Sequence, residues 1–371
     1  MKIGIDAKWF FNGPPSGRVV VYNLIKSLVV QNKEHEIYIF LDRRTKQLKF
    51  PFVNKKLHLV YLWADNNLLS NFFIVPLLGL KLKIDIFIGQ NFSPFVSTFK
   101  RICFIHDISF ESNPSFFTKQ ELLYFFPMKI LARRAHKVST ISISEKQRLI
   151  KYSYNKPENI YIVPNGIDHN KFKPLCFHSE ELIRATRERY KLPEKYLLYL
   201  GRLNIRKNID ILLQSISILK NKSIPLVLAG KYDWKMYDVN ELINRYNLAH
   251  RTILTGYVED EFLPSLYSLS KIFCFISYDE GFGLPPLEAM ASGVPVVVSD
   301  IDPHREVCGQ AGFYVDPHKP RDVASKIDNL LDDESLYNQK RELGIKRASL
   351  YSWEKSAKKL LECVLSLKSS S

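Results

Sequence analysis

The sequence predicts an α/β protein of two domains, each built on a parallel β-sheet. Short apolar, β-rich runs alternate with helical patterns along almost the whole chain, which is typical of parallel sheets. The length of 371 residues suits two domains of ordinary size, each with its own core. A polar, charged stretch from Asp168 to Glu194 separates the halves and indicates a connection between the domains.

Seven apolar runs in the first half are expected to form strands. The opening run carries an acid and a glycine where a signal peptide needs continuous apolar residues, so we expect a core strand there. Helical patterns at Val19–Val30 and Thr118–His136 provide crossover connections of the kind that parallel strands require. The expected strands are Lys2–Asp6, Glu36–Leu41, Leu57–Tyr61, Ile84–Gly89, Arg101–His106, Lys137–Ile141 and Ile160–Val163.

The second half repeats this alternation and ends in a helix. The segment from Tyr351 to Lys368 is predicted as an amphipathic helix with Ser352 as its N-cap, and Trp353 is expected to serve in packing. The expected strands are Tyr196–Leu200, Leu226–Ala229, Thr252–Leu254, Ile272–Ile276 and Val294–Ser299. The expected helices are Asn208–Lys220, Val239–Tyr246, Glu261–Ser268, Pro285–Ala291 and Arg321–Asp332.

Composition indicates a soluble protein of the cytoplasm. The longest apolar run, Leu68–Leu80, is too short to span a bilayer and is interrupted by Asn71, Pro76 and Gly79. The five cysteines form no close pairs, which argues against a disulfide framework or a zinc site and for a reducing compartment. We therefore expect no metal and no other cofactor.

Basic residues are concentrated in the first half. Residues 1–180 hold 26 Lys and Arg against 13 Asp and Glu, whereas residues 181–371 hold 27 against 25. This excess predicts an anionic partner for the first half, such as a phosphorylated substrate or an anionic membrane face, with solvated surface charge as the alternative. Nucleic acid is not expected, because no zinc-finger, basic-zipper or RNP motif is present.

The stretch from Phe275 to Met290 is the most informative part of the chain. A β-rich run ends there in an acidic, glycine-bearing turn, after which Pro285 and Pro286 open a helix, where a missing N–H costs nothing. The backbone amides of Gly281–Leu284 would lie at the positive end of that helix. This arrangement predicts an anion site suited to a phosphate.

Two glutamates bracket this turn and helix. Glu288, about one turn into the helix, can accept hydrogen bonds from a ribose diol, as the acid of a dinucleotide fold does. Glu280 stays in the turn, close to whatever is bonded to the phosphate. Together they predict a site for a nucleotide-sugar.

A second strand end is expected to bring cations to the same crevice. Gly201–Asn208 follows the strand predicted at Tyr196–Leu200 and precedes a helix. Arg202 can bind phosphate oxygens in a forked geometry, and Lys207 can act as a point charge. Arg206 is expected to face water.

The glutamate pair resembles the signature of the retaining glycosyltransferases of family 4. Glu280 and Glu288 enclose Gly-Phe-Gly-Leu-Pro-Pro-Leu, and Ala-Ser-Gly-Val-Pro-Val-Val follows at 291–297. Members of that family are GT-B enzymes, with two Rossmann-like domains around a cleft and a last helix that crosses back to the first domain. In the family an arginine and a lysine, here matched by Arg202 and Lys207, neutralise the departing diphosphate.

The resemblance also implies roles for residues of the first half. His106, in a His-Asp segment at a strand end, would contact the transferred sugar or line the acceptor approach, and Asp107 would brace the loop. Gly17 matches a glycine-rich turn that approaches the diphosphate and the acceptor, although an inserted Pro-Pro at 14–15 departs from the family pattern. Arg18 is expected to touch phosphate or acceptor, with surface charge as the alternative.

The resemblance implies four segments and a donor site. An N-terminal acceptor-binding domain would span 1–168, an inter-domain connection 169–194, a nucleotide-sugar-binding domain 195–350, and a crossover helix 351–371. Gly256–Val258 would lie over the nucleobase, mostly through backbone groups. The full set of expected donor contacts is Gly17, Arg202, Lys207, Gly256, Tyr257, Val258, Glu280, Gly281, Phe282, Gly283, Leu284 and Glu288, with Gly17, Arg18, His106 and Asp107 on the acceptor side.

We therefore expect a metal-independent, retaining hexosyltransferase that acts in surface polysaccharide synthesis. Its acceptor would be a saccharide or a lipid-linked saccharide, and an anionic membrane surface is a further expected partner. The chain resembles enzymes that build bacterial surface polysaccharides, especially in Ile5-Asp6-Ala7 and in the His-Asp-Ile-Ser segment from His106. This resemblance favours GDP-mannose as the donor, with UDP-sugars second. Three alternatives remain: a sugar-nucleotide epimerase or hydrolase of this fold, a phosphorylase, and a non-catalytic nucleotide-sugar-binding module. The sequence leaves the oligomeric state open.

Overall fold

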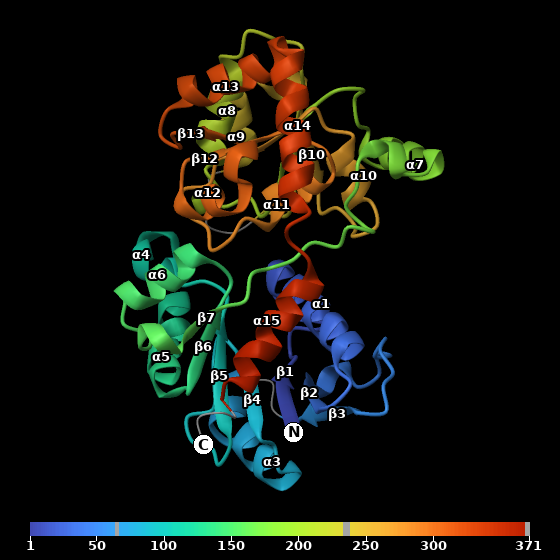
Figure 1. Cartoon of the computed structure of the whole chain (residues 1–371). Coiled ribbons are helices and arrows are strands. Elements are labelled where there is room, and N and C mark those ends of the chain that lie inside the picture. The colour runs from blue at the N-terminus through green and yellow to red at the C-terminus, as the bar shows by residue number, and fades with distance from the viewer. Residues whose placement is uncertain (64–66, 233–237, 368–371) are drawn as a thin grey trace. The chain divides into compact units, whose positions relative to one another are not determined.

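The computed structural model in Figure 1 describes residues 1–63, 67–232 and 238–367. The chain divides into two compact units. Unit 1 consists of Met1–Gly166 together with Ser352–Ser371, and unit 2 consists of Ile167–Tyr351. Residues 368–371, at the end of the predicted crossover segment, lie outside the described residues.

Unit 1 is built on a seven-stranded sheet in the order β3-β2-β1-β4-β5-β6-β7. All neighbouring strands run parallel, and the buried aliphatic and aromatic side chains of the strands form the core. The seven strands predicted for this half are confirmed. They are β1 (Lys2–Asp6), β2 (Glu36–Asp42), β3 (Leu57–Leu62), β4 (Ile86–Gln90), β5 (Lys100–Ile105), β6 (Lys137–Thr140) and β7 (Ile160–Ile162).

Helices connect these strands. The predicted helix at 118–136 begins at Lys119, because Thr118 and Glu121 form a reciprocal capping box. The main helical segments of unit 1 are α1 (Pro15–Gln31), α2 (Asn67–Leu69), η2 (Ser70–Ile74, a π-helical segment), α3 (Val75–Leu82), α4 (Ser109–Ser112), α5 (Lys119–Arg134), α6 (Ile143–Lys151) and α15 (Trp353–Leu365). Within the described residues, no helix is both long and apolar enough to cross a bilayer.

Unit 2 holds a six-stranded parallel sheet in the order β10-β9-β8-β11-β12-β13. Five of its strands match the predicted ones, whereas β13 was not predicted; it is an edge strand whose two central residues are only half-buried. The strands are β8 (Leu197–Leu200), β9 (Leu226–Ala229), β10 (Thr252–Gly256), β11 (Ile272–Phe275), β12 (Val296–Ser299) and β13 (Gly312–Val315). The main helical segments are α7 (Glu180–Tyr190), η6 (Ile205–Lys207), α8 (Ile209–Ser217), α9 (Val239–Arg245), α10 (Leu263–Ser268), α11 (Leu284–Ala291), α12 (Asp302–Cys308), α13 (Pro320–Asp332) and α14 (Glu334–Ala348).

The polar stretch that we interpreted as a connection belongs to unit 2. Ser179 caps α7 by accepting a hydrogen bond from the backbone of Leu182. The ring of Tyr190 packs edge-on against Phe262, with 5.7 Å between centroids. Only one face of α7 is apolar, so its composition resembles a linker although the helix is packed.

The last helix crosses back to unit 1, as predicted. Ser352 caps α15, and Trp353 is buried in unit 1. The Gln31 side chain of α1 donates a 3.0 Å hydrogen bond to the backbone oxygen of Glu354. A Cβ at Gly166 would lie 2.3 Å from the backbone of Ser352 and Trp353, so the close approach of the two chain segments requires glycine there.

Candidate active site

The candidate site of unit 2 lies where the strand order of its sheet reverses. β8 and β11 are neighbours at the centre, while β9 and β10 extend the sheet on one side and β12 and β13 on the other. In an open parallel sheet, the loops at the carboxyl ends of two such strands diverge and leave a crevice. Gly201–Asn208 follows β8, and the glutamate turn follows β11.

A buried ion cluster joins these two loops. Lys207 and Glu280 form an ion pair, and the guanidinium of Arg206 lies 3.7 Å from Glu280. Burial by itself raises the pKa of Glu280, but the charges of Lys207 and Arg206 outweigh this effect and lower the pKa to about 2. Glu280 is therefore ionised at neutral pH.

The side chain of Lys207 is buried, although the residue lies in a loop where a lysine is usually exposed. Its side chain is only 10% exposed, and its ammonium group lies 4.8 Å from the centre of the Phe275 ring. Burial lowers its pKa to about 8 against the attraction of Glu280. The backbone N–H of Lys207 donates to the side chain of Asn204, which fixes the short helix η6.

The expectation that Arg206 faces water is wrong. Its side chain is 13% exposed and donates a 3.2 Å hydrogen bond to the backbone oxygen of Asp279. The backbone oxygen of Arg206 in turn accepts from the N–H of Tyr278. Nothing in the residue type reveals this position, because the loop after β8 folds onto the loop after β11.

The turn before α11 has the geometry of an anion site. Gly283 is the N-cap with φ of 111°, a left-handed conformation that favours glycine. Pro285 and Pro286 lie within the first turn, as predicted, and the helix begins at Leu284. Pro285 and Pro286 have no N–H, so in the first turn of the helix it is the backbone amide of Leu284 that could donate to a phosphate. Phe282 is buried against Tyr351, with 5.8 Å between ring centroids, which anchors the turn.

Glu288 is held on the next turn of α11. The hydroxyl of Tyr267 donates a 2.8 Å hydrogen bond to its carboxyl. Burial raises the pKa of Glu288 to about 7, although that hydrogen bond opposes the change. The side chain is half-buried, so part of it still reaches solvent.

The other predicted donor residues of unit 2 lie on loops at the same edge of the sheet. Arg202 is exposed, and its backbone oxygen accepts a 3.0 Å hydrogen bond from Tyr199. Gly256 ends β10 with φ of 65°. Tyr257 is half-exposed, whereas Val258 is buried in the core and offers a ligand only its backbone.

In unit 1, His106 lies at the carboxyl end of β5, as predicted. Its Nε2 is 2.8 Å from the side-chain oxygen of Gln90, and its backbone N–H donates to Asn91. The ring lies 5.3 Å from that of Trp9. Burial lowers the pKa of His106 to about 4, so the ring is neutral at neutral pH. Asp107 braces the loop by accepting from the N–H of Ser109.

The glycine-rich turn is organised around Trp9, which sequence reasoning missed. A Cβ at Gly17 or at Gly13 would lie 2.8 Å from the Trp9 side chain. Pro15 is the first residue of α1, so the inserted prolines start the helix without breaking it. Arg18 is half-buried in the first turn.

His304 was also missed. It lies in α12, which follows β12, the neighbour of β11, so its loop meets the same edge of the sheet. The imidazole is fully buried, and its ring centre lies 5.7 Å from that of Phe275. The signal available in the sequence was its place a few residues after a predicted strand end.

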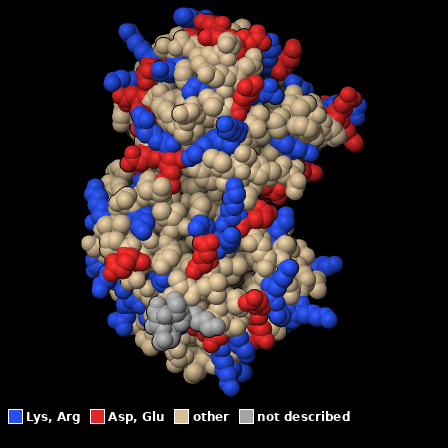
Figure 2. All heavy atoms as spheres, in the orientation of Figure 1, with Lys and Arg blue, Asp and Glu red and all other residues tan. Residues whose placement is uncertain are grey.

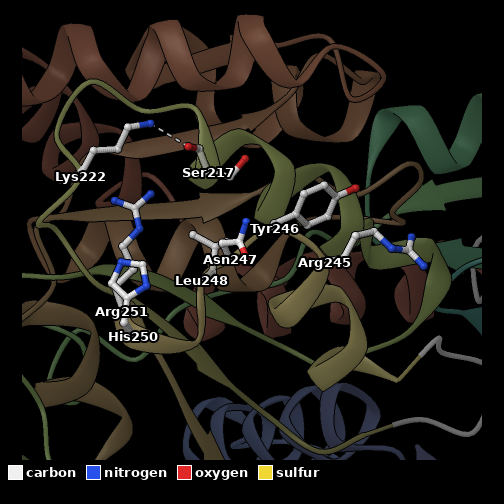
Figure 3. A pocket seen from close by; sticks show the side chains of 8 residues that line it. All are labelled: Ser217, Lys222, Arg245, Tyr246, Asn247, Leu248, His250 and Arg251. Carbon is white, nitrogen blue, oxygen red and sulfur yellow. Dashed lines mark hydrogen bonds between the residues drawn. The ribbon is translucent and has the colours of Figure 1, made fainter.

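A cavity of about 410 Å³ lies elsewhere on unit 2 (Figure 3). Arg251 and Lys222 line it but donate to backbone oxygens at the end of α8, including those of Ile216 and Ser217. Arg251 directly precedes β10, so the cavity is at the amino ends of the strands, opposite Glu280. Its cations stabilise a helix end. Among the described residues, no group of three or more His, Cys, Asp or Glu is arranged to hold a metal ion.

Family models match both halves of the chain. Residues 17–171 match "Glycosyltransferase Family 4", and residues 183–347 match "Glycosyl transferases group 1". The O-antigen chain mannosyltransferase B of Escherichia coli is 30% identical over 280 residues, which are 72% of this chain and 71% of that protein. The chain belongs to the family 4 glycosyltransferases.

Some relatives are much longer than this chain. The serotype-specific mannosyltransferase WbdA of Escherichia coli is 30% identical over 270 residues, which are 71% of this chain but 33% of WbdA. The chain thus matches about a third of the length of that relative.

Solved structures confirm the GT-B fold. Sucrose-phosphate synthase of Thermosynechococcus elongatus superposes with a TM-score of 0.79 at 20% identity, and all of both chains is covered. Anabaena HepE, solved with UDP and glucose, superposes with a TM-score of 0.75 at 19% identity over 99% of this chain and all of that one. The prediction of two Rossmann-like parallel-sheet domains is confirmed.

Proposed function

We propose that this protein transfers a hexose from a nucleoside-diphosphate sugar to a hydroxyl of a saccharide acceptor. The observation that carries the proposal is the meeting of the Lys207–Glu280–Arg206 cluster with the amino end of α11 at the reversal point of the sheet. Cations and helix amides there suit a diphosphate. The adjacent carboxylate of Glu280 suits the hydroxyls of the attached sugar.

The charges of the site suggest a role for each group during binding and departure of the diphosphate. In the free protein Glu280 neutralises Lys207, and an arriving diphosphate would compete for the ammonium group. Lys207, Arg202 and the amides of Gly281–Leu284 would then stabilise the charge that develops on the leaving oxygen, the term that usually dominates in such sites. These fixed charges could do so without a metal, so we propose a metal-independent reaction.

We further propose that the anomeric configuration is retained. The acceptor would attack from the face that the diphosphate leaves, and the leaving phosphate would take the acceptor proton. Glu280 would orient sugar hydroxyls and form no covalent bond to the sugar. Its pairing with Lys207 and Arg206 supports this role, because a carboxylate held by two cations is a weak nucleophile.

GDP-mannose is the proposed donor, with a UDP-sugar second. The relatives WbdA and O-antigen chain mannosyltransferase B are mannosyltransferases by name, which supports mannose. HepE was solved with UDP and glucose, which keeps UDP-sugars as the second candidate. The test is to incubate the protein with a panel of nucleotide sugars, with and without saccharide acceptors, and to measure nucleoside diphosphate and glycoside.

Each outcome of this panel separates the proposed activity from its alternatives. Acceptor-dependent release with a retained linkage supports the transferase. Release or isomerisation without acceptor would indicate a hydrolase or an epimerase. Tight binding of the donor without any product would indicate a non-catalytic module.

We also propose that unit 1 binds an anionic membrane that carries a lipid-linked acceptor. Helical segments α2, η2 and α3 bury one face, including Ile74 and Val75, in the core. Their outer face is apolar as well, and a helix that is apolar all round is normally buried. The outward side chains are Leu69, Phe73, Leu77 and Leu80, which are 51–62% exposed.

Charge near this face favours an anionic leaflet. Lys81 and Lys83 are exposed at the end of α3, and Lys and Arg side chains lie along much of the visible outline of unit 1 in Figure 2. Each such cation near an anionic surface contributes about 1 kcal/mol. The structure also corrects one detail: Phe72 stacks on Phe95 at 5.5 Å and is a packing residue, whereas Phe73 points outward.

Flotation with neutral and anionic vesicles over a salt series tests this proposal. We expect recovery with anionic vesicles that falls as salt rises, because charges are screened beyond about 8–10 Å near physiological ionic strength. A Phe73→Ser/Leu77→Ser variant should lose binding, while Leu350→Ser, an exposed leucine of unit 2, should not. Equal recovery with both vesicle types, or none with either, would contradict the proposal.

A further inference from the structure

His304 is held in one orientation and one tautomer. Its Nδ1 lies 3.1 Å from the backbone oxygen of Ser299. A carbonyl oxygen can only accept, so Nδ1 carries the hydrogen and donates. In a neutral imidazole the other nitrogen, Nε2, is then an acceptor with its lone pair directed away from Ser299.

Within residues 1–63, 67–232 and 238–367, this acceptor has no hydrogen-bond partner. Nε2 of His304 is buried and makes no hydrogen bond in the described part of the chain. Burial lowers the pKa of His304 to about 4, so protonation does not satisfy the nitrogen at neutral pH. A buried polar atom without a partner is costly, and such atoms are uncommon in folded proteins. A ligand with a hydrogen-bond donor could therefore satisfy Nε2 of His304.

The neighbourhood of Nε2 is the proposed diphosphate-sugar site. A Cβ at Gly283 would lie 3.3 Å from Cδ2 and 3.9 Å from Nε2 of His304. Because residue 283 is glycine, the side of the ring next to the amino end of α11 is not occupied by a side chain from that position. The charges of Glu280 and Lys207 act on the imidazole from the same site.

The chemistry of Nε2 limits what it can bind. A neutral acceptor repels phosphate oxygens, which also carry lone pairs, and it cannot serve the charged cluster as a cation. A sugar hydroxyl can donate a hydrogen bond to Nε2, and a hexose carries several hydroxyls around its ring. We propose that His304 accepts, through Nε2, a hydrogen bond from one hydroxyl of the donor hexose and thereby contributes to the choice of sugar.

This inference rests on the proposed function and makes His304 a specificity-determining residue. A role in packing alone would predict a different result, because the ring also supports Gly283 and contacts Phe275. A packing defect would weaken all donors alike. Loss of one hydrogen bond affects only donors that carry the hydroxyl in question.

The test combines a variant with modified donors. His304→Asn keeps an N–H for the oxygen of Ser299 and removes the acceptor at the Nε2 position. His250→Asn, at an exposed position two residues before β10, is the matched control. Both variants and the wild type are assayed with the preferred nucleoside-diphosphate hexose and with deoxy analogues that each lack a different hydroxyl, after their urea midpoints are compared.

We expect His304→Asn to lower kcat/KM for the complete donor by about two- to thirteen-fold, the range for one neutral hydrogen bond. For one deoxy donor, wild type and variant should be equally slow. His304→Gln, which can place an amide near the Nε2 position, should recover part of the loss. His250→Asn should behave as wild type.

Two results would overturn the inference while leaving the proposed function intact. One is an equal loss for every donor, and the other is an unchanged kcat/KM in folded His304→Asn. A wild-type protein that binds or turns over no nucleotide sugar would refute the proposed function, and this inference with it.

Discussion

Removing one charge at a time from the ion cluster should reveal an asymmetry between its members. The cluster contains two cations, Lys207 and Arg206, and one anion, Glu280. Lys207→Met leaves Glu280 with Arg206 at 3.7 Å, a balanced pair. At an effective dielectric constant of about 20, that pair still attracts by about 4 kcal/mol. The variant loses one charge-assisted hydrogen bond, so its unfolding free energy should fall by about 1–3 kcal/mol.

Glu280→Gln should be more damaging to stability. It removes the carboxylate that pairs with both Lys207 and Arg206, and breaking a buried ion pair by removing one partner costs about 3–5 kcal/mol. A bound nucleoside diphosphate would supply the missing negative charge, so it should stabilise Glu280→Gln more than it stabilises the wild type. Turnover should fall about a hundredfold in folded Lys207→Met, because one preorganised contact to the leaving group contributes about 3 kcal/mol.

Urea denaturation with and without nucleoside diphosphate, together with product release, provides the assay. An acid titration adds a second readout. The folded-state pKa of Glu280, about 2, is below its ordinary 4.5, so its stabilisation is complete above pH 4.5 and is lost as pH falls from 4.5 to 2. Glu280→Gln should lack this dependence. Equal destabilisation by the two single variants, or wild-type turnover in Lys207→Met, would refute the assignment of the cluster.

Two further variants test other parts of the site. Glu288→Gln should weaken nucleoside-diphosphate binding by about 1.5–3 kcal/mol in calorimetry. The free energy of unfolding of the wild type should fall as pH rises from 4.5 to 7, because the folded state holds a proton on Glu288 that the unfolded state has lost, and Glu288→Gln should lack this fall. Unchanged nucleoside-diphosphate affinity in the variant would contradict the contact between Glu288 and the ribose. Gly230→Ala would place a Cβ 1.9 Å from the backbone oxygen of Gly201 and should cost several kcal/mol, whereas Gly256→Ala, with nothing within 4 Å, should cost about 1–2 kcal/mol. Similar urea midpoints for these two glycine variants would contradict the close approach of the two loops.

The fold was predictable because each strand of a parallel sheet is a local apolar run. The strands from β1 to β12 were all recognised, because most of them are buried on both faces and therefore form continuous apolar runs. The short β13 and the half-polar α7 were not, since their burial depends on neighbours that are distant in sequence.

The sequence by itself determined the family, the two-domain fold and the loops that carry the candidate site. Its motif around Glu280 places an acidic turn and the start of a helix directly after a strand, a property of contiguous residues. Tertiary structure alone decided that Arg206 and Lys207 share Glu280, that Trp9 covers Gly17, and that a buried acceptor of His304 finds no partner among the described residues. These facts depend on which strand ends are adjacent in the sheets. Adjacency is set by packing between distant segments, and no local pattern encodes it.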